Sequence, residues 1–169
     1  MKGLIVYQTT TGSAECYAKW LEEETGFTAR PVNKAGNWKT YDTLIIGSCI
    51  RMGSPKISGW IKKNWSKLKD KNLVFFTTSG SLKTEPELQT NFESCFPEEI
   101  RSHLPYFPLN GKMVFSELKW LERGIMNFAI KMTAKSDPEK AKKMAREYNR
   151  VNRDEIRPIV DYVKNLRQM

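Results

Sequence analysis

The chain has 169 residues, 40% of them hydrophobic and 28% charged, and this composition predicts one globular domain over residues 1–169. The sequence has no apolar run near the roughly 18 residues of a membrane span, no secretory signal pattern, and three cysteines without a CxxC motif. We therefore expect a cytoplasmic protein. The formal net charge of +9 indicates an acidic protein surface, an anionic small molecule, nucleic acid or an anionic membrane as partner, unless it serves solubility alone.

The N-terminal stretch predicts a phosphate site. Residues 4–7 form an apolar strand, and residues 9–13 (TTTGS) form a hydroxyl-rich turn. Apolar residues with the i, i+3, i+4, i+7 spacing of a helix follow: Ala14, Tyr17, Ala18 and Leu21. The first N–H groups of a helix have no partner within it, and the helix dipole is positive there. The turn contains no lysine, so we expect neutral donors to hold the phosphate.

Strands and helices alternate through the middle of the chain. Residues 43–50 form a continuous apolar strand of the kind that is buried on both faces of a parallel sheet. The other predicted elements are an edge strand at 28–32, a loop at 33–40, a helix at 57–68, a strand at 73–78 and a helix at 87–96. This alternation predicts a parallel α/β sheet with right-handed crossovers.

The last third of the chain supplies a fifth strand and three helices. Pro105 and Pro108 predict turns, and residues 112–116 are the predicted fifth strand. Helices are predicted at 118–132, after the Asp137-Pro138 pair, and at 153–166.

The helix at 118–132 has more apolar residues than one core face needs. One face is predicted to pack on the core: Leu118, Leu121, Ile125, Ala129 and Met132. Trp120, Met126 and Phe128 are then either buried on a second side or form a contact surface for a porphyrin, a quinone or a protein.

Five parallel strands suit the order 2-1-3-4-5, in a sheet covered by helices on both faces. In that order ligands bind where strands 1 and 3 diverge. Polar loops follow strands 1, 3 and 4, at residues 9–13, 51–55 and 79–81. All three should meet at the C-terminal edge of the sheet.

The first loop resembles the phosphate loop of flavodoxins, T/S-x-T-G-x-T. Residues 9–13 match position by position, whereas Ala14 stands where the family usually has threonine. One hydroxyl contact to the phosphate is therefore missing. The resemblance implies a flavodoxin-like three-layer sandwich that binds FMN.

The segment after the third strand is similar to a narrower group, the menaquinone-dependent protoporphyrinogen oxidases, which carry an I-G-x-S-I-R-Y-G pattern. Residues 46–53 read IGSCIRMG, with Cys49 in place of serine and Met52 where an aromatic residue often covers the flavin. The helix at 118–132 also resembles the helix that this group inserts after strand 5.

The resemblance implies that the three loops bind FMN, although each could instead be an ordinary turn. The residues expected at the cofactor are Thr9, Thr10, Thr11, Gly12, Ser13, Ala14, Ser48, Cys49, Ile50, Arg51, Met52, Gly53, Thr78, Ser79, Gly80 and Ser81. Arg51 is expected either to hold an anionic reduced flavin or a substrate carboxylate, or to be a solvated surface arginine. We assign no side chain a catalytic role. His103 is the only histidine and the cysteines are widely spaced, so we expect no metal site.

The resulting hypothesis is an FMN-dependent oxidoreductase that resembles a quinone-dependent protoporphyrinogen oxidase of heme biosynthesis. Basic clusters at residues 51–71 and 131–153 would attract tetrapyrrole carboxylates or the anionic inner face of the cell membrane. One alternative is a flavodoxin-type electron carrier that docks to a protein redox partner. Another is a flavin-free binding module on the same fold. Nucleic-acid binding has only the charge in its favour, so we expect none.

Overall fold

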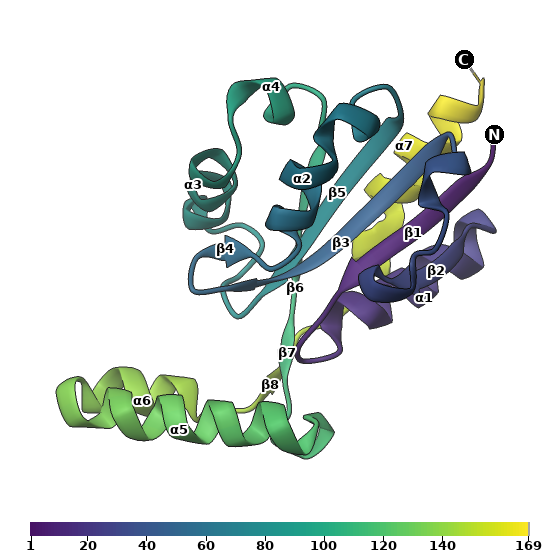
Figure 1. Cartoon of the computed structure of the whole chain (residues 1–169). Coiled ribbons are helices and arrows are strands. Elements are labelled where there is room, and N and C mark those ends of the chain that lie inside the picture. The colour runs from purple at the N-terminus through teal and green to yellow at the C-terminus, as the bar shows by residue number, and fades with distance from the viewer. Residues whose placement is uncertain (169) are drawn as a thin grey trace.

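The structure is a computed structural model that describes residues 1–168, with a central sheet between two layers of helices (Figure 1). The strands are β1 (Gly3–Gln8), β2 (Thr28–Pro31), β3 (Thr43–Arg51), β4 (Ser54–Pro55), β5 (Asn72–Ser79), β6 (Tyr106–Asn110), β7 (Lys112–Met113) and β8 (Tyr148–Asn149). The α-helices are α1 (Ser13–Thr25), α2 (Ser58–Leu68), α3 (Pro86–Cys95), α4 (Glu98–Arg101), α5 (Trp120–Ser136), α6 (Pro138–Met144) and α7 (Arg157–Gln168). Short 3-10 helices cover Val32–Lys34, Trp38–Thr40, Phe115–Glu117 and Arg153–Ile156.

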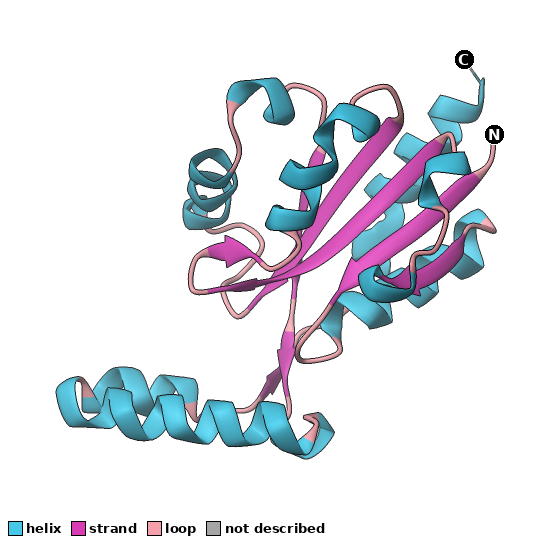
Figure 2. Cartoon of the chain, viewed as in Figure 1, coloured by secondary structure: helices cyan, strands magenta, loops and turns pink. Residues whose placement is uncertain are grey.

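The main sheet has the predicted topology. Its parallel strands lie in the order β2-β1-β3-β5-β6, which is the expected order 2-1-3-4-5 (Figure 2). The short β4 adds a sixth strand, antiparallel to the end of β3. β1, β3 and β5 therefore end side by side at one edge, where the predicted loops begin.

Each face of the sheet has its own hydrophobic core. On one face Ile61 and Trp65 of α2 pack with Phe92 of α3 and Phe75 of β5. On the other, Tyr17 and Leu21 of α1 pack with Ile159 and Val163 of α7. The layers approach closely at Gly47 in β3, where a Cβ atom would lie 2.3 Å from the ring of Phe76. The three-layer sandwich predicted from the sequence is confirmed.

The prediction of the fifth strand was wrong in its position. The strand that pairs with β5 is β6, which contains Pro108, whereas residues 112–113 form β7 and pair with β8 in a separate two-stranded sheet. Proline lacks a backbone N–H, but β6 lies at the edge of the main sheet, where a strand has one unpaired side. Of the two prolines at which we predicted turns, Pro105 precedes β6 and Pro108 lies within it.

α5 and α6 form a helical hairpin that stands away from the three-layer body (Figure 1). β7 and β8 are its two connections to the body, and the predicted Asp137 cap is confirmed, because its Oδ1 accepts a hydrogen bond of 2.9 Å from the Lys140 N–H. Of the residues predicted to pack on the core, Leu118 is buried but lies just before α5, so the expectation that the helix itself buries a core face was wrong. None of its residues, all of which lie in the described part of the chain, is buried.

Candidate functional site

The loop between β1 and α1 forms a polar cradle. Gly12 sits at the N-cap of α1 with φ +80°, a left-handed conformation that glycine adopts at low cost. Within residues 1–168 no side chain caps this helix end, so its first N–H groups point toward the loop without a side-chain acceptor. The strand, turn and helix start on which the predicted phosphate site rests are present, and phosphate binding itself stays a prediction.

The three threonines of the loop have different surroundings. The Oγ1 atom of Thr9 is buried and has no hydrogen-bond partner among the residues that the structure describes. Thr10 Oγ1 lies 3.4 Å from the sulfur of Cys49 and accepts a hydrogen bond of 3.2 Å from Lys56 Nζ. Thr11 Oγ1 lies 2.9 Å from the hydroxyl of Ser13. A buried hydroxyl without a partner is costly, so Thr9 indicates a missing polar ligand.

Two lysines from outside the turn flank the cradle. Lys56 follows β4 and reaches Thr10. Lys112 in β7 donates its N–H to Ser13 Oγ at 2.9 Å, and its side chain passes over Gly12, where a Cβ atom would lie 3.7 Å from Cε and 4.0 Å from Nζ. The Lys112 ammonium pairs with Glu117.

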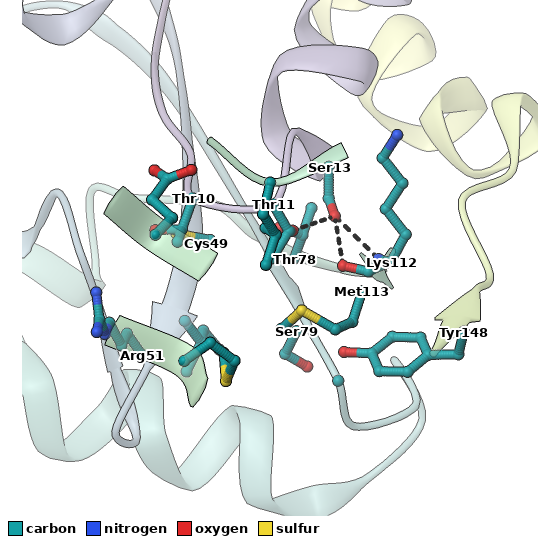
Figure 3. Close-up of a pocket in the computed structure, with 16 residues that line it drawn as sticks. Thr10, Thr11, Ser13, Cys49, Arg51, Thr78, Ser79, Lys112, Met113 and Tyr148 are labelled. Atoms are coloured by element: carbon teal, nitrogen blue, oxygen red, sulfur yellow. Dashed lines mark hydrogen bonds between the residues drawn. The ribbon is translucent and has the colours of Figure 1, made fainter. Parts of the chain in front are cut away.

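A cavity opens beside the cradle, at the C-terminal edge of the sheet (Figure 3). Its walls come from the loop after β1 and the start of α1, from the C-terminal ends of β3 and β5, from the glycines just after β5 and β6, and from β7, β8, Leu118 and α5. The lining residues are Thr10, Thr11, Ser13, Cys49, Ile50, Arg51, Thr78, Ser79, Gly80, Gly111, Lys112, Met113, Leu118, Glu122, Met126 and Tyr148. Residues from all three predicted loops line the cavity, although the loop at 51–55 contributes only Arg51, which is the last residue of β3.

Several predicted site residues lie outside the cavity wall. Ser48 is buried, and its hydroxyl accepts from the Ile57 N–H at 3.1 Å and donates to the Cys49 carbonyl at 3.0 Å. Met52 has a positive φ of 51° and is 97% exposed. The others outside the wall are Thr9, Gly12, Ala14, Gly53 and Ser81, of which Ala14 lies in the first turn of α1 and is packed in the core. A role for these residues at the cofactor stays a prediction.

Sequence reasoning missed the wall made by β8. Tyr148 packs on Gly80, where a Cβ atom would lie 2.6 Å from the phenol oxygen. Arg150 lies over the Tyr148 ring at 4.7 Å and donates to the Gly80 carbonyl at 2.9 Å. Burial raises the pKa of Tyr148 above its ordinary value. No local pattern marks residues 148–150, because only the pairing of β7 with β8 brings them to the site.

A buried network fixes the end of β6 just before Lys112. The Glu155 carboxylate accepts from the Asn110 N–H at 2.9 Å and from the Tyr17 hydroxyl at 3.0 Å, and it pairs with Lys83 at 3.2 Å. Burial, followed by the neighbouring Glu155 charge, raises the pKa of Tyr17 well above its usual range. Tyr17 also accepts a hydrogen bond of 3.2 Å from the Asn152 N–H. α1, β6 and the segment before α7 are thus held together behind the cradle.

The fold and the site define a class of protein: α/β proteins with a doubly wound sheet and a polar cradle after the first strand. Comparison with known sequences places the chain within that class: the sequence pattern of the flavodoxin domain family matches residues 4–140. The chain belongs to this family.

Individual relatives are more distant. The chain is 22% identical over 147 residues to protoporphyrinogen IX dehydrogenase (quinone) of Escherichia coli strain K12, a match that covers 79% of this chain and 81% of that protein. Among solved structures, it is similar to a flavoprotein in complex with FMN from Lactobacillus acidophilus NCFM, with 14% identity, a TM-score of 0.46, and coverage of 64% of this chain and 91% of that one. A flavodoxin from the domain Archaea has 17% identity, a TM-score of 0.44, and coverage of 79% and 99%.

Proposed function

We propose that this protein binds FMN at the C-terminal edge of its sheet and acts as an oxidoreductase. The observation that carries the proposal is the cradle at residues 9–13, where a buried Thr9 hydroxyl and the uncapped start of α1 both lack a partner among the described residues. A phosphate monoester supplies oxygens for both. Membership of the flavodoxin domain family supports the same cofactor.

In this proposal the flavin ring occupies the cavity next to the cradle. Cys49 and Ile50 form one wall, and Thr78 and Ser79 form another. Met126 of α5 lines the cavity from the hairpin side, where its polarizable sulfur can pack on a ring. FMN supplies the redox chemistry, and the protein supplies position and polar contacts.

For the substrate, we propose a tetrapyrrole with carboxylate side chains and a quinone as electron acceptor. The support is the match to the dehydrogenase of Escherichia coli and the position of Arg51, which is exposed and lines the cavity. A guanidinium can bind a carboxylate through two parallel hydrogen bonds. Arg51 would thus orient the substrate at the mouth of the cavity.

We further propose a cytoplasmic protein that contacts the anionic inner face of the cell membrane through α5. The described residues contain no helix able to span a bilayer. The outer face of α5 is a stripe of exposed apolar side chains, which we call the α5 stripe: Trp120, Leu121, Ile125, Phe128 and Met132. Lys131 and Lys135 lie at the C-terminal end of the same helix, and both are exposed. Apolar residues next to lysines are typical of helices that lie in a membrane interface.

The same helix connects this surface to the cavity. Glu122 and Met126 of α5 line the cavity, whereas the α5 stripe is exposed to solvent. A helix seated in the membrane interface would therefore hold the cavity close to the lipid, where a quinone dissolves.

The proposal is tested with purified protein loaded with FMN. Anaerobic mixing with protoporphyrinogen and a menaquinone analogue should produce porphyrin, which is detected by its fluorescence, and Arg51→Ala should slow this at low substrate concentration. Absence of porphyrin would refute the tetrapyrrole activity. If the same sample passes single electrons to a protein acceptor, the protein is an electron carrier.

A further inference from the structure

Lys112 brings a positive charge to the cradle, although it lies far from the cradle in the sequence. It lies 99 residues from Ser13, yet its N–H donates to the Ser13 hydroxyl, and its ammonium lies over the turn at Gly12. Only 16% of its side chain is exposed. Figure 3 shows Lys112 beside Ser13 at the rim of the cavity.

We propose that Lys112 binds the phosphate of FMN and makes this site select FMN over riboflavin by charge. The inference rests on the proposed binding of FMN. A partly buried ammonium adds a direct Coulomb attraction to the phosphate charge, which neutral donors lack and which water screens less than it would at the surface.

Glu117 competes with the phosphate for this ammonium. It is the present partner of Lys112, and its side chain is 47% exposed. A half-exposed carboxylate can return to water at low cost, whereas a phosphate in the cradle carries more negative charge and is held by the α1 N–H groups as well. Binding of FMN therefore transfers Lys112 from Glu117 to the phosphate.

Lys56 marks the opposite side of the cradle but contributes less. Its Nζ atom donates to Thr10 at 3.2 Å, and the residue is exposed. Water and salt screen an exposed charge more strongly than one that is mostly buried. We therefore expect the selectivity to depend chiefly on Lys112.

The experiment compares the dissociation constants of FMN and riboflavin for the same set of variants, measured by quenching of flavin fluorescence. Riboflavin has the same ring system without the phosphate, so it reports on the cavity alone. We expect Lys112→Met to weaken FMN binding about tenfold and riboflavin binding less than about twofold. Lys112→Arg, which keeps the charge, should retain most of the preference for FMN.

Two further variants test whether freeing Lys112 strengthens FMN binding and whether the loss of FMN affinity is specific to Lys112. Glu117→Gln should tighten FMN binding about threefold without changing riboflavin binding, because it releases Lys112 in the free protein. Lys69→Met removes an equal charge at the end of α2, at the opposite edge of the sheet, and should change neither constant.

The outcomes separate this inference from the proposed function. Suppose that the wild-type protein binds FMN. If Lys112→Met then lowers the affinities for FMN and riboflavin equally, or changes neither affinity, the role of Lys112 is refuted and the FMN site stands. If the wild-type protein binds neither flavin, both are refuted. If Lys112→Met fails to fold, an unchanged FMN affinity in Glu117→Gln overturns the inference by itself.

Discussion

The α5 stripe gives a prediction whose size follows from side-chain exposure. Trp120 is 84% exposed and Phe128 is 66% exposed, so most of the surface of Trp120 and about two thirds of that of Phe128 are available to a membrane. Full burial of a large apolar side chain contributes roughly 1.5–3 kcal/mol, and rings in a membrane interface remain partly hydrated, so we expect about 1.5 kcal/mol for each. Replacing both with serine should therefore weaken membrane binding by about 3 kcal/mol, or more than 100-fold.

The assay is co-sedimentation with large vesicles. Wild-type protein should bind vesicles that contain phosphatidylglycerol and release from them at high salt, because the lysines near the stripe contribute attraction that salt screens. Trp120→Ser with Phe128→Ser should remain in the supernatant. Leu82→Ser, which removes an exposed apolar side chain from the loop after β5, should bind as the wild type does.

Two results would refute this reasoning. One is that the wild-type protein does not bind anionic vesicles at low salt. The other is a dimer in light scattering that becomes monomeric in the double serine variant without any vesicle binding, which would assign the α5 stripe to a second copy of the chain. The net charge of +9 opposes such self-association.

Three other predictions concern the body of the protein. Ser13→Ala leaves the Lys112 N–H without its acceptor and should lower the free energy of unfolding by about 1–2 kcal/mol while weakening FMN binding; urea unfolding and flavin titration measure the two effects, and no change in either would contradict the hydrogen-bond assignment. Burial raises the pKa of Tyr17 above its ordinary value of 10.0, so the unfolded chain ionises first, and stability should fall as the pH rises above about 10; Tyr17→Phe should flatten this decline in urea unfolding, and an equally steep decline in the variant would contradict it. Arg51→Ala should raise the KM for a carboxylated tetrapyrrole about tenfold with little change in kcat, and an unchanged KM in a steady-state assay would remove Arg51 from the substrate site.

The sequence predicts the body of the fold because its signals are local. Apolar runs such as residues 43–50 and 73–78 alternate with helices of regular spacing, which leaves few topologies. The phosphate loop is also local, since strand, turn and helix start follow one another within residues 3–13. The structure agrees with the sequence in both.

The failures come from contacts between distant segments. Pro108 suggests a turn by itself, and only its place in an edge strand makes a strand acceptable. Lys112 and Tyr148 reach the site because β7 pairs with β8 across the hairpin, a contact that no pattern in either segment encodes. The apolar residues of α5 fit a core helix equally well, and spacing cannot tell whether a partner is protein or membrane.

The measurement that tests the account most directly is a titration of the purified protein with FMN, followed by visible absorbance and by quenching of flavin fluorescence. We predict one FMN per chain, a shifted flavin spectrum, and binding that Ser13→Ala and Lys112→Met both weaken. A protein that leaves the spectrum and fluorescence of FMN unchanged at micromolar concentrations would contradict the assignment of the cradle and the cavity to a flavin.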